Sequence, residues 1–196
     1  MKTIKKRVFS KNHYNSGDGM LTTVWGPGMW HSLHTISFNY PIKPTCDDKT
    51  NYRNFLLNLR FVLPCGKCRS NLCKNLKILP LKFNNMQSRE TFSKYVYNLH
   101  ELINKMLGKV SGLSYNEVKE RYEHFRARCS IKPITTIILN KESKNKTLKK
   151  REQLPEKGCT EPIYGEKSKC VLHIVPAKKK CETFNIDEKC LKKRIE

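Results

Sequence analysis

The chain has 196 residues, enough for one domain and a tail because domains most often run to about 100–150 residues. Lysine and arginine total 39 against 17 aspartate and glutamate, a formal net charge of +22 at pH 7. No apolar run approaches the roughly 18–20 residues of a membrane span, and the charged N-terminus lacks the apolar stretch of a secretory signal. We therefore expect a cytoplasmic protein that is neither membrane-spanning nor secreted.

Composition divides the chain into three regions. Residues 1–21 are polar and basic, and we expect them to be flexible. Residues 22–130 hold both tryptophans and most other aromatic side chains, enough to build a core. Residues 131–196 have few aromatic residues and no helical periodicity, so we expect a basic, cysteine-containing tail that is disordered or loosely packed.

The first two predicted helices lie between residues 27 and 64. Pro27 suits the first turn of a helix, which the Asn39-Tyr40-Pro41 sequence then ends. A second helix begins near Asp47 and Asp48, whose charges suit a helix N-terminus, and continues until Pro64.

Three further helices follow at short intervals. The third carries Cys65 and Cys68 in its first turn, and the fourth is capped by Ser88 and stopped by Gly108. A capping-box sequence at 114–117 opens a shorter fifth helix. The predicted fold class is all-α: a four-helix bundle with a fifth short helix packed across it, followed by a poorly structured basic tail.

The nine cysteines are numerous for a chain without an export signal, and in a reducing compartment they more often bind metal or perform redox chemistry than form structural disulfides. Their positions are 46, 65, 68, 73, 129, 159, 170, 181 and 190. Among them, only Cys65 and Cys68 have the C-x-x-C spacing, which makes this pair the first candidate for chemistry.

Two thiols three residues apart at the start of a helix lie on one face, close enough to form a disulfide. The free N–H groups and positive dipole of a helix N-terminus lower the pKa of a thiol, and we expect Lys67 and Arg69 to act in the same direction. The alternative is a zinc-stabilised helical interaction module in which Cys73 and a histidine join Cys65 and Cys68. Because the chain has no second C-x-x-C pair, we favour redox exchange and expect no metal.

A dithiol on an all-α scaffold needs an acceptor for two electrons, which suggests a cofactor held between helices. Trp30 and His34 share a helix face and could stack on and hydrogen-bond a flat heterocycle, although such pairs also occur in cores. His100 and Asn104 repeat the spacing on the fourth helix, and the alternative is a buried histidine bonded to that asparagine.

The charge also permits a different function, that of a basic nucleic-acid-binding protein. The basic residues are spread over all three regions and no recognised binding motif is present. We therefore do not expect nucleic acid as a partner, and a basic surface that steers acidic substrates is the favoured interpretation.

Three segments of the chain form a recognisable combination: 25–35 (WGPGMWHSLHT), 64–68 (PCGKC) and 100–109 (HELINKMLGK). Together they resemble the Erv/ALR family of FAD-linked sulfhydryl oxidases. The corresponding motifs of that family are W-G-x-x-x-W-x-x-x-H-T, P-C-x-x-C and H-N-x-x-N-K-x-L-G-K. Order and separation agree across roughly residues 22–126. Glu101 departs from the pattern, since it stands where the family has an asparagine.

The resemblance implies a route for electrons. Substrate thiolate would attack the exposed Cys65, Cys68 would pass electrons to FAD, and O2 would be reduced to hydrogen peroxide. Trp30, His34, His100 and Asn104 would hold the adenine and ribose. The full set of expected cofactor-binding residues is Gly26, Trp30, His34, His100, Asn104, Lys105, Lys109 on the phosphate side, and Tyr122, which stands where the family commonly has a tryptophan.

Partners and setting also follow from the resemblance. We expect protein dithiol substrates or a thioredoxin-like carrier, and a homodimer formed through the first helices. The second structural cysteine pair of many cellular members is incomplete, because Leu113 and Ser114 stand where the partner of Cys129 would be. Together with the composition, this resembles members from large DNA viruses, which implies host cytoplasm, viral factory or virion.

The remaining cysteines have less specific interpretations. We expect Cys46 and Cys73 to be small buried side chains. The four tail cysteines are either a mobile dithiol that ferries electrons or simply exposed thiols, and the second interpretation is favoured: Cys159, Cys170, Cys181 and Cys190.

Overall fold

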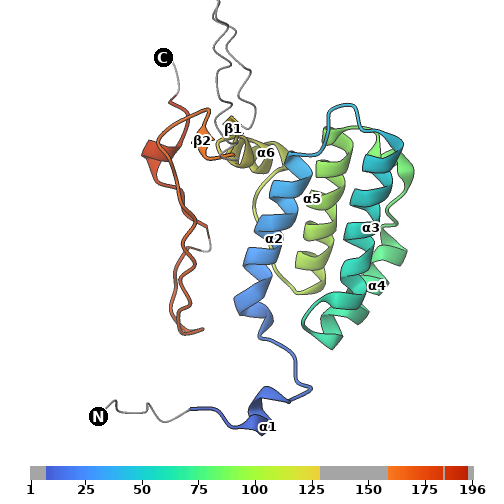
Figure 1. Ribbon diagram of the computed structural model, residues 1–196, viewed down its shortest axis with the longest axis vertical. Coiled ribbons are helices and arrows are strands. Elements are labelled where there is room, and N and C mark those ends of the chain that lie inside the picture. Colours follow the sequence, from blue (N-terminus) through green and yellow to red (C-terminus); the bar gives the residue numbers. More distant parts are fainter. Residues whose placement is uncertain (1–7, 129–158, 183, 194–196) are drawn as a thin grey trace, which may run out of the picture. The chain divides into compact units, whose positions relative to one another are not determined.

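The computed structural model describes residues 8–128, 159–182 and 184–193 (Figure 1). The chain forms two compact units, residues 1–115 and 116–196, and each is described by itself. The elements in order are α1 (Lys11–Tyr14), α2 (Thr22–Phe38), α3 (Cys46–Val62), α4 (Gly66–Ile78), the 3-10 helix η1 (Phe83–Met86), α5 (Arg89–Met106), α6 (Tyr115–Glu123), β1 (Ala127–Arg128), β2 (Glu161–Pro162) and the 3-10 helix η2 (Glu188–Cys190).

Helices α2 to α5 form a four-helix bundle. Figure 1 shows them side by side: α2 packs on α5, α3 packs on α4, and α4 also contacts α5. The short η1 lies against α3 and α5. The predicted all-α bundle is therefore confirmed, whereas the predicted packing of the fifth helix across it stays a prediction.

One hydrophobic core fills the space between the four helices. It is built from the apolar stripes that the sequence presents at three- and four-residue steps. Its buried members are Leu33, Tyr40, Leu56, Leu59, Leu63, Leu72, Leu76, Leu81, Met86, Phe92, Tyr95, Val96 and Leu99. Trp30 and Cys68 pack against this core at its edge, so the candidate site borders the core.

The starts of α3 and α5 lie where the sequence predicts them. Thr45 caps α3, because its Oγ1 accepts the N–H of Asp48 at 3.1 Å and the Asp48 carboxylate accepts the N–H of Thr45 at 2.9 Å. Ser88 caps α5 by accepting the N–H of Thr91 at 3.2 Å. Both signals are local, so they could be read without knowledge of the fold.

The start of α2 differs from the prediction. The helix begins at Thr22, and Pro27 therefore lies in its second turn rather than its first. The carbonyl of Leu21 accepts the N–H groups of Val24 and Trp25, which supports the additional turn. Because Pro27 has no N–H, the carbonyl of Thr23 receives no helical hydrogen bond from it.

The second unit contains α6 and a two-stranded antiparallel ladder in which Ala127 pairs with Pro162. Tyr122 of α6 lies against two phenylalanines of this unit, with ring centroids 6.0 Å from Phe125 and 6.4 Å from Phe184. Cys129 lies outside the described residues. Within the described residues, no helix is both long and apolar enough to cross a membrane.

Candidate active site

The cysteine pair lies where α3 gives way to α4. Cys65 is the N-cap of α4, and its Sγ accepts the N–H of Cys68 at 3.2 Å. The two sulfur atoms are 2.6 Å apart. A pair held this closely at a helix N-terminus can alternate between dithiol and disulfide with little movement of the backbone.

The turn before Cys65 is held by hydrogen bonds on both sides. The carbonyl of Leu63 accepts the N–H of Cys65 at 2.8 Å and Nη1 of Arg69 at 2.6 Å. The carbonyl of Pro64 accepts the N–H of Met20 at 2.8 Å. Gly19 approaches this turn so closely that a Cβ on it would lie 2.9 Å from the Pro64 oxygen, so the position requires glycine.

The two thiols differ in their protonation behaviour. Hydrogen bonds from the side chain and then the backbone of Cys68 lower the pKa of Cys65. Burial, followed by the hydrogen bond with Cys65, raises the pKa of Cys68. In the reduced pair the thiolate therefore forms more readily on Cys65.

The two basic residues beside the pair, Lys67 and Arg69, have different contacts. The guanidinium of Arg69 is directed to the carbonyl of Leu63, and it is the backbone of Lys67 that hydrogen-bonds Cys65 and lowers its pKa. The causes that lower the pKa of Cys65 are thus hydrogen bonds, and an effect of the two side-chain charges stays a prediction.

A row of residues on α2 leads away from the cysteines at four-residue steps: Thr22, Gly26, Trp30 and His34. Thr22 Oγ1 lies 3.4 Å from Cys68 Sγ at one end of the row. Gly26 is buried, yet a Cβ on it would meet nothing nearer than the Thr22 methyl group at 3.7 Å. The middle of the row therefore has room beside the helix that no side chain fills.

At the other end of the row, α2 and α5 bring three predicted residues together. The Trp30 indole stacks on the His100 imidazole with ring centroids 3.9 Å apart and planes 8° apart. His34 Nε2 lies 3.0 Å from His100 Nδ1, within hydrogen-bonding distance. Asn104 Nδ2 instead donates to Glu101 Oε1 at 3.1 Å, so the alternative of a His100–Asn104 bond is wrong.

Both imidazoles of this cluster resist protonation. Burial, and then the neighbouring His100, lowers the pKa of His34 to about 3. Burial also lowers the pKa of His100 to about 4, with Glu101 opposing the shift and Lys109 adding to it. The two rings are therefore neutral near pH 7, and a hydrogen bond between them requires one ring to donate and the other to accept.

The two predicted lysines lie at the exposed end of α5. Gly108 has φ of +66°, and beyond it the N–H of Lys109 donates to the carbonyl of Asn104 at 2.8 Å. This is a Schellman turn, which fixes the backbone of Lys109 just past the helix. Because the Lys109 charge acts on His100, the lysine is close enough to influence the imidazole cluster electrostatically.

The other predicted residues have separate outcomes. Tyr122 belongs to the second unit, and its expected cofactor contact stays a prediction. Cys46 is exposed, so the expectation that it is buried is wrong: it occupies the open first position of α3. Cys159 is disulfide-bonded, so the favoured interpretation of the tail cysteines as simply exposed thiols is wrong for this residue, and the electron shuttle stays a prediction.

A zinc site finds no support in the described residues. Within these residues, no three His, Cys, Asp or Glu side chains come together as metal ligands would. Cys73 is a free, half-buried thiol on α4 and does not join Cys65 and Cys68. The alternative of a zinc-stabilised module is therefore not supported by the geometry.

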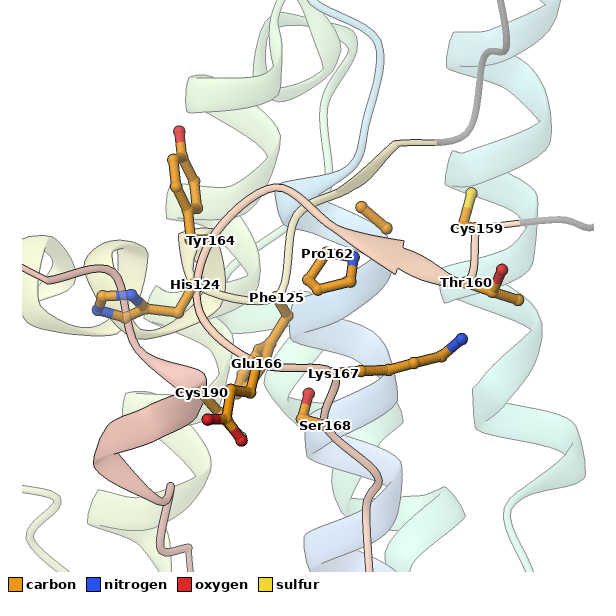
Figure 2. A pocket seen from close by; sticks show the side chains of 11 residues that line it. His124, Phe125, Cys159, Thr160, Pro162, Tyr164, Glu166, Lys167, Ser168 and Cys190 are labelled. Carbon is orange, nitrogen blue, oxygen red and sulfur yellow. The ribbon is translucent and has the colours of Figure 1, made fainter.

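The second unit contains a cavity of about 200 Å³ (Figure 2). His124 and Lys167 point to opposite sides in this view, and His124 Nδ1 accepts the N–H of Lys192 at 3.0 Å. None of the predicted cofactor-binding residues lines this cavity. Its polar groups do not converge on one point, so it is not the candidate site.

Sequence reasoning missed two residues of the site, Thr22 and Gly19. Thr22 stands four residues before Gly26, on the same face of α2. A predicted helix that began at Thr22 instead of near Pro27 would have included it. The contact of Gly19 with the turn before Cys65 joins distant segments and carries no local signal.

Comparisons with known proteins give the family of this chain. A model of the Erv1 / Alr family matches residues 27–123. A probable FAD-linked sulfhydryl oxidase of Acanthamoeba polyphaga mimivirus is 39% identical over 99 residues, which cover 50% of this chain and 68% of that protein. An FAD-linked sulfhydryl oxidase of African swine fever virus is 32% identical over 99 residues, covering 50% and 80%. The crystal structure of the yeast Erv1 core superposes with a TM-score of 0.48 at 23% identity and covers 62% of this chain and 96% of that one.

Proposed function

Since this chain belongs to the Erv1/Alr family and is an FAD-linked sulfhydryl oxidase, we propose that Cys65 and Cys68 form its reactive disulfide and that the α2–α5 interface holds the FAD. The observation that carries the proposal is the short distance of 2.6 Å between the two sulfur atoms at the start of α4. A thiol substrate exchanges with a disulfide formed by such a pair.

The packing of Cys68 against the core supports an order for the reaction in which Cys65, the position that the family resemblance gives as exposed, meets the substrate first. The substrate thiolate attacks Cys65 Sγ, a bond forms between them, and the Cys65–Cys68 bond breaks so that Cys68 leaves as a thiolate with the electron pair. A second substrate thiolate displaces Cys65, which releases the substrate disulfide and leaves both cysteines reduced. The lowered pKa of Cys65 supports this second step, because a thiol of lower pKa leaves faster.

The residues on α2 and α5 fit a flavin nucleotide. Trp30, His34 and His100 offer a neutral aromatic surface, and with Asn104 they would hold the adenine and ribose. Lys105 and Lys109 would lie on the phosphate side. When bound, the flavin supplies an acceptor for the two electrons of the dithiol and passes them to O2, which gives hydrogen peroxide.

Gly26 is the remaining part of the proposed cofactor site. The room beside its Cα lies in the α2 row between Thr22, which contacts Cys68, and Trp30, which contacts His100. A flat ring system placed along this row would reach from the sulfur atoms toward the aromatic cluster.

We also propose partners and a setting for the enzyme. Its thiol substrates are protein dithiols or a thioredoxin-like carrier, and its functional form is a homodimer built through the first helices of the bundle. Relatives in mimivirus and African swine fever virus support the host cytoplasm, viral factory or virion as its place of action.

Single serine substitutions of the two cysteines test the proposed route. The purified full chain should be yellow and should consume oxygen when given dithiothreitol. Cys65→Ser and Cys68→Ser should each reduce oxygen consumption to background while flavin absorbance and helical circular dichroism remain, because the fold does not depend on the disulfide.

Cys73→Ser is the matched control, since Cys73 is also a free thiol on α4 but is not part of the pair. This variant should keep the activity of the parent enzyme. Continued turnover by Cys68→Ser would exclude the proposed order of electron transfer.

A further inference from the structure

The first side chain of α2 contacts a reacting sulfur atom. Thr22 Oγ1 lies 3.4 Å from Cys68 Sγ, and either group can donate while the cysteine is a thiol. Once Cys68 has become a thiolate, its sulfur carries no proton, so the hydroxyl of Thr22 must be the donor. The contact therefore gains strength as negative charge develops on Cys68.

The backbone around Thr22 holds it beside the cysteine pair. The N–H of Met20 donates to the carbonyl of Pro64, one residue before Cys65, and Gly19 lies against the same turn. The segment that leads into α2 is thereby attached to the segment that leads into α4. Thr22 follows Met20 by two residues. The backbone contacts of Gly19 and Met20 with Pro64 therefore hold the Thr22 hydroxyl near Cys68.

Cys68 requires such a donor more than Cys65 does. Burial raises the pKa of Cys68, and the hydrogen bond with Cys65 raises it further, while Thr22 and the Cys68 backbone act in the opposite direction. Cys68 is also the sulfur that the proposed exchange expels. A leaving thiol with a high pKa departs slowly, so a group that stabilises its thiolate accelerates the step.

We propose that the Thr22 hydroxyl is a catalytic hydrogen-bond donor that stabilises the Cys68 thiolate as the substrate opens the Cys65–Cys68 disulfide. This inference rests on the proposed function of the pair. In the step, the substrate sulfur bonds to Cys65, the Cys65–Cys68 bond breaks, Cys68 keeps the electron pair, and the Thr22 proton is shared with it but not transferred. Stabilisation of the expelled sulfur more than of the intact disulfide lowers the barrier.

The test measures the reactivity of Cys68 without any turnover. In the full chain with FAD bound and carrying Cys65→Ala, the rate of alkylation of Cys68 by iodoacetamide is followed by peptide mass spectrometry across a range of pH. Adding Thr22→Val should raise the apparent pKa of Cys68 and slow alkylation at neutral pH by about three- to tenfold, since a hydrogen bond to a charged group is lost at a partly solvated position.

Two variants complete the test. Thr22→Ser keeps the hydroxyl and should restore the parent rate. Thr23→Val makes the same change at the next residue, which is exposed and has no described contact with the sulfur atoms, and should leave the rate unchanged. Equal alkylation profiles with and without Thr22→Val would overturn the proposal.

A second measurement uses the enzyme with both cysteines present. Opening of the Cys65–Cys68 disulfide by a small thiol should be about three- to tenfold slower in Thr22→Val than in Thr23→Val. The failure of the inference is distinguishable from that of the proposed function. If the parent oxidises thiols through the pair but Thr22→Val alters neither rate, only the role of Thr22 is refuted.

Discussion

At the scale of single residues, the contact between His34 and His100 makes the α2–α5 interface sensitive to acid. In the unfolded chain both imidazoles take up protons near pH 6.5, whereas in the folded chain they do so only near pH 3 and pH 4. Between these limits the unfolded state binds more protons, so acid favours unfolding. The contribution of the two neutral imidazoles to the stability of the folded chain is complete above pH 6.5. It is lost as the pH falls toward 4 and then 3.

This linkage predicts a loss of stability between pH 7 and pH 4. The share that comes from the two rings should be on the order of 6 kcal/mol in the free energy of unfolding. Urea unfolding at pH 7 and at pH 4, with excess FAD throughout, measures the total loss of stability. Carboxylates also contribute to this total.

The His34→Gln variant separates the histidine share from the rest. It should be less stable than the parent at pH 7 but should lose less stability on going to pH 4, because one titrating ring has been removed. Parallel losses in parent and variant would show that His34 does not hold its neutral form in the folded chain.

The residues of the site could be predicted to different extents. Cys65 and Cys68 were found from spacing alone, and Trp30, His34 and His100 from helical periodicity together with the family resemblance. The stacking of Trp30 on His100 could not be predicted, because it depends on how two helices face each other across the bundle. The exposure of Cys46 likewise depends on which part of α3 the bundle covers.

At the scale of elements, the end of α5 depends on one glycine. Gly108 adopts φ of +66°, and a Cβ there would meet nothing within 4 Å. Gly108→Ala should therefore lower the free energy of unfolding by about 1–2 kcal/mol through backbone strain alone, without a steric clash. Thermal or urea unfolding of the variant measures this loss.

Gly28 provides a matched comparison within α2. A Cβ there would also meet nothing within 4 Å, but the residue lies inside a helix. Gly28→Ala should raise the free energy of unfolding by about 0.5–1 kcal/mol, since alanine is the better helix former. If both alanine variants changed the free energy of unfolding in the same direction, the left-handed conformation of Gly108 or the helical conformation of Gly28 would be contradicted.

Some helix boundaries are set by neighbouring residues and others by contacts with distant segments, and only the first kind could be predicted from the sequence. The caps at Thr45 and Ser88 lie next to the turns they begin, so the starts of α3 and α5 were predictable. The start of α2 was not, since the additional turn from Thr22 follows a segment that is fixed by bonding to Pro64. Pro27 was placed one turn too early because a helix can tolerate proline beyond its first turn when other contacts support it.

At the scale of the whole molecule, the net charge of +22 should govern how the enzyme meets its substrates. A strongly basic surface attracts acidic partners, and salt weakens that attraction because the Debye length falls from about 30 Å at 0.01 M to about 8 Å at 0.15 M ionic strength. For an acidic dithiol peptide, kcat/KM should fall severalfold over this range.

A neutral peptide with the same cysteine spacing serves as the comparison. Its kcat/KM should change by less than about twofold, since long-range steering requires charge on both partners. Oxygen consumption at several salt concentrations measures both values. Equal salt dependence for the two peptides would show that the basic residues do not guide substrate to Cys65.

The carbonyl of Leu63 has a consequence for the speed of the redox cycle. It accepts hydrogen bonds from both Cys65 and Arg69, while the next carbonyl is held by Met20. The main chain at the cysteines is thus anchored in three places, and conversion between oxidised and reduced forms is confined to small rotations about the Cα–Cβ bonds. We therefore expect the oxidised and reduced forms of the enzyme to share one backbone conformation at residues 63–65.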